Sequence, residues 1–122
     1  MPSTPYEILH FASTLTQQQT ETAHRCAVSR AYYSVFHHGL KVIDAKLPQT
    51  KNLVYSGGCH KQLYDKLVDG RSPEWISIAY RVDELKKKRI SADYHLDETI
   101  PVHIAQESIA RAQEIIQELD AI

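Results

Sequence analysis

The amino-acid sequence predicts an all-α protein in which residues 1–122 form a single domain, a bundle of four to five helices. Apolar residues recur at steps of three and four along several long segments, which is the spacing of one helix face. No stretch of useful length alternates between apolar and polar residues as a strand would. The chain has 122 residues, 43% hydrophobic and 24% charged, which suits one buried core.

The first two expected helices are bounded by residues that favour helix ends. Thr4 is a suitable N-cap ahead of Pro5, and the first helix is expected to run to Leu15. Residues 17–20 lack apolar periodicity and predict a turn. The second helix, 22–47, is the longest. Because apolar residues follow it on two strips, we expect it to lie at the centre of the bundle.

The remaining sequence predicts a loop, a short helix and two long amphipathic helices. The loop covers residues 48–58 and ends in a pair of glycines, and the short helix covers 59–68. The fourth helix starts at Ser72 and Pro73, again a cap followed by proline. The last helix starts near 99–101 and repeats apolar residues at a heptad-like spacing, so both long helices are expected to present an apolar seam.

The charge balance argues against a protein that coats nucleic acid without sequence preference. The net charge is −1, whereas such proteins are normally basic. Any contact with nucleic acid is therefore expected to come from a local patch. One run of basic residues is present, and it consists of Lys86, Lys87, Lys88 and Arg89.

The sequence shows no pattern of export, membrane insertion, metal binding or cofactor binding. Cys26 and Cys59 make no disulfide framework, and we expect both thiols to be reduced in a cytoplasmic protein. The N-terminal residues lack the pattern of a signal peptide, and the longest apolar run is far shorter than a membrane span. None of the seven histidines has metal-site spacing, and no nucleotide-binding loop occurs, so neither a metal nor a cofactor is expected.

Arg30 interrupts one apolar strip of the second helix, which it shares with Cys26, Tyr33 and His37. An arginine buried there would need a carboxylate, because an unpaired buried charge is very costly. We expect a structural ion pair with Asp93 on the fourth helix, and direct contact with a substrate is the alternative. The adjacent tyrosines at 32 and 33 are expected to anchor the core rather than to stack on bases.

Arg89 lies on the otherwise apolar seam of the fourth helix, and two interpretations remain open. In the first, the guanidinium of Arg89 reaches water or pairs with Asp93. In the second, Arg89 lies at a cleft or dimer seam and its guanidinium holds a phosphate through two hydrogen bonds. His95 follows six residues later, about 120° around an unbroken helix. The two side chains converge only if the helix ends near Tyr94 or if two subunits each contribute one. Alone, His95 would be a favourable cation at a helix end.

Three segments together resemble the small prokaryotic HEPN domains. The run from Arg30 to His37, R-A-Y-Y-S-V-F-H, resembles a signature of that family, and Arg89 to Tyr94 resembles its R-x-x-A-D-Y segment. His60 begins a short helix similar to one in the same group. The resemblance covers residues from about 5 to 120. It implies an antiparallel bundle of four or five helices that forms homodimers.

Many HEPN proteins are metal-independent endoribonucleases with an arginine followed four to six residues later by a histidine. Arg89 and His95 match that pattern, which implies that they are catalytic, with His37, Arg30, Asp93 and Tyr94 in supporting or structural roles. RNA supplies its own nucleophile, the 2′-hydroxyl. His95 would move protons, Arg89 would stabilise charge on the phosphorus, and the lysines at 86–88 would attract the RNA backbone.

An alternative within the same family is a non-catalytic module that binds a nucleotide or a partner protein, such as a nucleotidyltransferase antitoxin. Some of these antitoxins modify a tyrosine two residues after the histidine of their partner. The residue at that place here is Asp97, and the nearby Tyr94 precedes His95, so the sequence departs from that pattern.

Overall fold

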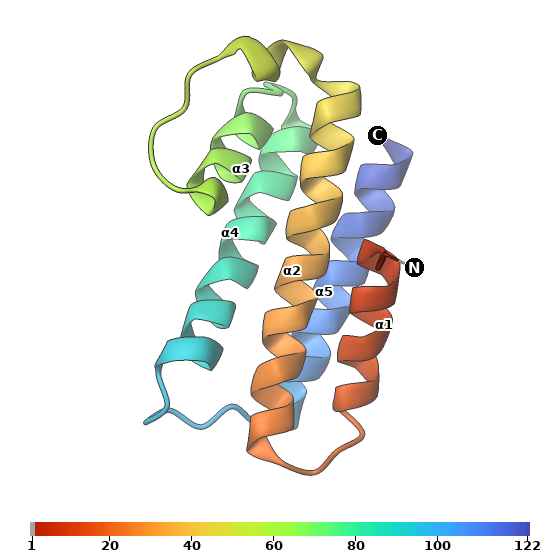
Figure 1. The fold of residues 1–122 in the computed structure, drawn as a ribbon, viewed down its shortest axis with the longest axis vertical. Coiled ribbons are helices and arrows are strands. Elements are labelled where there is room, and N and C mark those ends of the chain that lie inside the picture. The colour runs from red at the N-terminus through yellow and green to blue at the C-terminus, as the bar shows by residue number, and fades with distance from the viewer. Residues whose placement is uncertain (1) are drawn as a thin grey trace.

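The computed structural model describes residues 2–122, and these form five α-helices and one short 3₁₀ helix without any strand (Figure 1). The all-α prediction is therefore confirmed. The elements in chain order are α1 Pro5–Leu15, α2 Glu21–Lys46, η1 Pro48–Asn52, α3 Cys59–Val68, α4 Pro73–Tyr94 and α5 Val102–Ala121.

Short polar side chains cap three of the helices, at Thr4 and Ser72 as predicted and also at Thr20. The hydroxyl groups of Thr4, Thr20 and Ser72 each accept a hydrogen bond from the backbone N–H three residues later. The predicted loop at 48–58 needs a correction, because its first part forms η1. Pro48 fixes the backbone at the first position of this turn, which favours helical geometry there.

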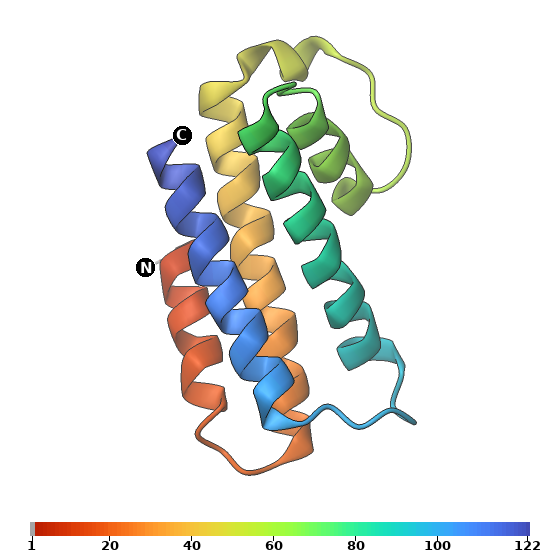
Figure 2. The same ribbon diagram turned by 180° about the vertical axis from the view of Figure 1, so that it is seen from behind.

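The four long helices alternate in direction along the chain, as expected for an antiparallel bundle. Helices α1 and α4 run opposite to α2, but α5 runs parallel to it (Figures 1 and 2). Contacts at the two ends of the α2–α5 pair agree with this direction. Glu21 accepts a hydrogen bond from the backbone of Ile100, and His38 pairs with Asp120. The segment 53–58 returns the chain along the outside of the bundle, which makes α3 parallel to α2 (Figure 1).

The core is built around α2, as the two-strip pattern predicted, but only one strip is buried. The buried strip contains Val28, Tyr32, Val35, Gly39 and Val42. It packs against fully buried side chains of the surrounding helices, among them Leu63, Leu67, Ile78, Leu85, Ile115 and Leu119.

The other strip of α2 faces outward, which corrects the expectation for Arg30. Cys26, Arg30 and His37 are all exposed. The guanidinium of Arg30 lies 4.8 Å from the ring centroid of Tyr33, and within residues 2–122 it makes no ion pair with Asp93. This strip carries the polar members of the pattern, so turning it to solvent avoids the cost of burying a charge.

Arg25 is the buried arginine of α2, and its role was not foreseen from the sequence. Its side chain is 8% exposed, and its Nε donates to Glu21 over 2.7 Å. Its two terminal nitrogens lie within hydrogen-bond distance of backbone carbonyls at the end of α4 and in the following loop, those of Ser91, Ala92, His95 and Glu98. The last carbonyls of a helix lack intrahelical partners and favour a cation, so Arg25 fixes the end of α4 to α2.

We predict that Arg25→Ala lowers the melting temperature by several degrees, because carbonyls at the end of α4 lose their shared donor and Glu21 loses its partner. The matched variant Arg30→Ala, on the exposed strip, is expected to change the melting temperature by less than about two degrees. Thermal unfolding followed by circular dichroism measures both. An equal loss in the two variants would contradict the assignment of Arg25 as the anchor.

Candidate functional site

Arg89 lies between α4 and α2 with most of its side chain inside the protein. The side chain is 9% exposed, and its guanidinium carbon lies 5.4 Å from the ring centroid of Tyr32 and 5.6 Å from that of Tyr33. Nη1 is 3.3 Å from a carboxylate oxygen of Asp93, one turn further along α4. The pairing with Asp93, one of the two interpretations that the sequence left open for Arg89, is therefore present, and aromatic rings lie beside the cation as well.

The guanidinium of Arg89 is only partly satisfied. A guanidinium carries five N–H donors, and buried ones normally all find acceptors. Here Nε is fully buried without a hydrogen-bond partner. Within residues 2–122, Nη2 makes no hydrogen bond either, although it is not among the fully buried atoms. Arg89 thus has unused donors and positive charge that an anion would stabilise.

His60, the second residue of α3, joins the same group of side chains. Its Nδ1 lies 2.7 Å from the hydroxyl oxygen of Tyr32. The imidazole also packs against Phe36, with 4.8 Å between the ring centroids. We call the side chains of Arg89, Asp93, Tyr32, Tyr33 and His60 the Arg89 cluster. Its members come from α2, α3 and α4, so the packing of these three helices positions them.

Burial and nearby charge shift two pKa values within the Arg89 cluster. Burial raises the pKa of Tyr32, so its hydroxyl stays protonated at neutral pH. Burial also lowers the pKa of His60 below its ordinary value of 6.5, and the positive charges of Arg89 and Lys86 lower it further. The imidazole of His60 is therefore neutral near pH 7.

His95, the other half of the predicted catalytic pair, lies outside this cluster. Helix α4 ends at Tyr94, and His95 is its C-terminal cap. The side chain of His95 is 46% exposed, and its Nδ1 lies 3.3 Å from a carboxylate oxygen of Glu98. Within residues 2–122 no hydrogen bond or ion pair joins His95 to Arg89. Because the helix is regular between them, the side chains leave it in different directions, as the angle of about 120° requires.

Two further predicted residues stay on the surface. Tyr94 is 70% exposed at the end of α4. His37 is exposed on α2, where its ring lies 5.4 Å from that of Phe36. Neither side chain makes a hydrogen bond with the Arg89 cluster within the part of the chain that the structure describes.

The three lysines beside Arg89 spread around α4 in steps of about 100°, and Lys87 and Lys88 line one hollow together. Lys86 and Lys87 both pair with Asp83, over 3.5 Å and 3.3 Å. Lys88 faces α5, where it lines a hollow with Glu107 and Glu114. Only Lys86 is close enough to the Arg89 cluster to influence the pKa of His60.

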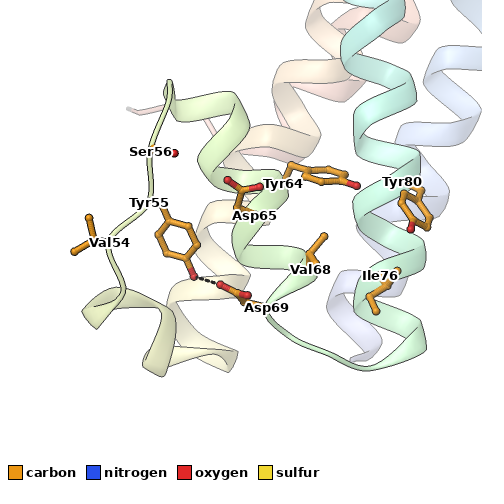
Figure 3. A pocket seen from close by; sticks show the side chains of 9 residues that line it. All are labelled: Val54, Tyr55, Ser56, Tyr64, Asp65, Val68, Asp69, Ile76 and Tyr80. Carbon is orange, nitrogen blue, oxygen red and sulfur yellow. Dashed lines mark hydrogen bonds between the residues drawn. The ribbon is translucent and has the colours of Figure 1, made fainter.

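Two further hollows beside α4 lie on its sides that face α2 and α3. One lies between α1, α2 and α4 and reaches the Arg89 cluster at Asp93; its lining includes Phe11, Cys26 and Arg30. The other lies between α3, α4 and the segment 54–56, and it is lined by three tyrosines and two aspartates (Figure 3). These are Tyr55, Tyr64, Tyr80, Asp65 and Asp69.

The hollow in Figure 3 does not suit a phosphate, because its charged groups are carboxylates. The hydroxyl of Tyr55 donates to Asp69 over 2.7 Å, and burial together with this bond raises the pKa of Tyr55 to about 12. The Arg89 cluster balances its carboxylate with a guanidinium that keeps an unbonded donor, Nη2, so it is the stronger candidate for an anionic ligand.

No family model, curated protein or solved structure matches the chain. Across residues 2–122, no group of three or more histidine, cysteine, aspartate or glutamate side chains is arranged to hold a metal ion. In the same range, every helix is too short or too polar to cross a membrane. Cys26 and Cys59 are free and exposed.

Of the residues singled out from the sequence, the structure brings Arg89, Asp93 and Tyr33 together and leaves His95 and Tyr94 apart. His37 reaches this group only through the ring of Tyr33, with 6.2 Å between the ring centroids. The residue that sequence reasoning left without a role here is His60. Its contact with Tyr32 spans 28 positions in the sequence, so no local spacing reveals it.

We predict that His60 makes the protein less stable in mild acid. The pKa of His60 is lower in the folded protein than its ordinary value of 6.5, which applies to the unfolded chain. Between the folded and the unfolded pKa, the unfolded chain therefore binds more protons at this position. The free energy of unfolding falls as the pH drops through this range. Melting temperatures of the parent and of His60→Gln at about pH 7.5 and about pH 5.5 test this. The loss on acidification should be smaller in the variant, and equal losses would contradict the lowered pKa.

Proposed function

We propose that the chain is a HEPN-type module and acts as a metal-independent endoribonuclease of toxin or defence type. The order of helices and the three segments described above support the family assignment. The observation that carries the activity is the incompletely satisfied guanidinium of Arg89, which lies beside the rings of Tyr32 and Tyr33. A charge fixed in this way before the substrate arrives stabilises a transition state without reorganising.

In this proposal the 2′-hydroxyl of RNA attacks the neighbouring phosphorus. The new P–O2′ bond forms while the P–O5′ bond breaks, which leaves a 2′,3′-cyclic phosphate and a 5′-hydroxyl. Arg89 stabilises the extra negative charge on the phosphorus through its planar fork. His95, whose side chain is 46% exposed, takes the proton of the 2′-hydroxyl and gives a proton to the leaving 5′-oxygen, so the protons balance.

The proposed active form is a homodimer, in which His95 of one copy meets Arg89 of the other. The absence of a contact between these side chains within residues 2–122 of one chain favours a shared site. Two large apolar side chains flank His95 and face solvent: Tyr94 is 70% exposed and Leu96 is 76% exposed. Exposed apolar groups side by side are typical of a surface that another protein covers.

A second candidate function is a non-catalytic HEPN module that binds a nucleotide or a partner protein such as a nucleotidyltransferase antitoxin. The specific observation that favours it is the pairing of His95 with Glu98, since a carboxylate beside the imidazole holds it away from a phosphate. Under this alternative Arg89 would be part of a binding site, and RNA would not be cut.

We predict that the purified protein cleaves RNA in the presence of a chelator and that Arg89→Lys and His95→Gln each reduce the rate by at least about 100-fold. Lysine keeps the charge of Arg89 but lacks its fork, and glutamine keeps hydrogen bonding at position 95 but does not titrate. Single-turnover cleavage of a labelled RNA measures the rate, with melting temperatures as a check on folding.

The matched controls remove the same residue types from α5, His103→Ala at an exposed position and Arg111→Ala at a half-buried one. Both should retain the activity of the parent. If all four variants cut RNA equally, the assignment of Arg89 and His95 is wrong. If the folded parent does not cut RNA with or without divalent metal, the second candidate function replaces the first.

We also predict that a single 2′-deoxy substitution at the cleavage position abolishes cutting at that position only, because it removes the nucleophile. Gel analysis of the labelled products checks this, together with the presence of a cyclic phosphate at the new 3′ end. Cleavage that persists at the 2′-deoxy position would require water as the nucleophile and would contradict the proposed chemistry.

A further inference from the structure

We infer that His60 is a phosphate-binding residue of the Arg89 cluster, and that its neutral imidazole donates a hydrogen bond from Nε2 to a phosphate oxygen of the ligand. This inference rests on the proposed function for the identity of the ligand as RNA, whereas the binding of phosphate itself does not depend on catalysis.

The first step concerns which nitrogen of His60 carries the hydrogen. Tyr32 is fully buried, and its hydroxyl makes one hydrogen bond within the described residues, to Nδ1 of His60. A buried hydroxyl that stays protonated needs an acceptor for its hydrogen. If Tyr32 donates, Nδ1 is the acceptor, and the hydrogen of the neutral ring lies on Nε2. The opposite tautomer would leave the Tyr32 hydrogen buried without an acceptor.

The second step concerns the charge of His60. Burial and the neighbouring positive charges of Arg89 and Lys86 oppose protonation of the ring. A neutral imidazole adds no further positive charge to the cluster, but it still presents one directed N–H group. Arg89 and Lys86 also attract an anion, and each is balanced in part by a carboxylate, Asp93 and Asp83 respectively.

The third step concerns access. His60 is half-buried, and Nε2 makes no hydrogen bond within residues 2–122. It is also not among the fully buried unpartnered atoms, unlike Nε of Arg89. Nε2 is thus a donor that solvent reaches, beside a cation whose own donors are incompletely used. A phosphate oxygen placed at Nε2 would accept this hydrogen bond and would face the field of Arg89.

This assignment separates the roles of two histidines. With its hydrogen on Nε2 and its Nδ1 occupied by Tyr32, His60 has no free lone pair to accept the proton of the 2′-hydroxyl. It therefore binds and orients phosphate, while proton transfer remains with His95, whose imidazole is exposed and does not contact Tyr32.

The tautomer of His60 is tested directly by ¹⁵N NMR of the imidazole nitrogens. We expect the Nδ1 shift of an unprotonated nitrogen and the Nε2 shift of a protonated one at neutral pH, and we expect Tyr32→Phe to remove this preference. A ring of His60 protonated on Nδ1 in the parent would overturn the inference.

Ligand binding is tested with three probes, namely inorganic phosphate, uridine 3′-monophosphate and a short oligodeoxyribonucleotide, which lacks the 2′-hydroxyl nucleophile and is not cut. Each probe should shift Nε2 of His60 in a saturable way, and uridine is the non-phosphorylated control. A response to inorganic phosphate alone would assign the site to a free anion, and no response to any probe would overturn the inference.

Two substitutions separate binding from catalysis at position 60. The amide nitrogen of glutamine lies where Nε2 does, whereas that of asparagine lies near Nδ1. His60→Gln should keep affinity for uridine 3′-monophosphate within about threefold of the parent, and His60→Asn should weaken it about tenfold. Equal affinity in the parent and both variants would overturn the inference, provided that their melting temperatures show that they fold.

The outcomes for His60 and for the proposed function are distinguishable. If Arg89→Lys and His95→Gln abolish RNA cleavage while His60→Asn binds and cuts like the parent, the nuclease stands and the role of His60 fails. If no variant or parent cuts RNA but phosphate still shifts Nε2 of His60, the nuclease fails and the phosphate site stands.

Discussion

The burial of the Arg89 guanidinium against the ring of Tyr32 is the interaction on which the rest of this structure depends. It joins α4 to the central helix, and it leaves a charge with unused donors. Removing such a group from water is costly, and apolar residues of similar volume would fill the space at a lower cost. The buried guanidinium of Arg89 therefore supplies positive charge and an unbonded donor rather than stability. For this reason we build the candidate site around this side chain.

The two arginines buried beside α4 have different tasks. Arg25 is saturated by a carboxylate and by backbone carbonyls, so it acts as a structural clasp between α2 and the end of α4. Arg89 has one long ion pair and two aromatic neighbours, so it remains available to an anion. The clasp also sets the position of the backbone at His95, whose carbonyl is one of its acceptors. The contacts that hold the end of α4 in place therefore also position the backbone of His95, one of the two proposed catalytic residues.

Local signals in the sequence were sufficient for the helices but not for the side-chain partners. Caps such as Thr4 and Ser72, together with apolar spacing, placed the helix ends to within a residue or two, because these preferences act over one turn. Partners lie on other helices, so periodicity could not tell which strip of α2 is buried. For this reason we predicted that Arg30 is buried, whereas the buried arginine of α2 is Arg25. It also left His60 without its partner Tyr32.

The most direct test of the central claim follows the guanidinium N–H signals of arginine by ¹⁵N NMR while uridine 3′-monophosphate is added to the intact protein. A binding site built on the unbonded Nη2 of Arg89 predicts a saturable shift of its guanidinium signals, with no shift for Arg111 on α5. If the Arg89 signal stays fixed throughout the titration while surface arginines respond, its burial serves the fold alone and the account of the site is wrong.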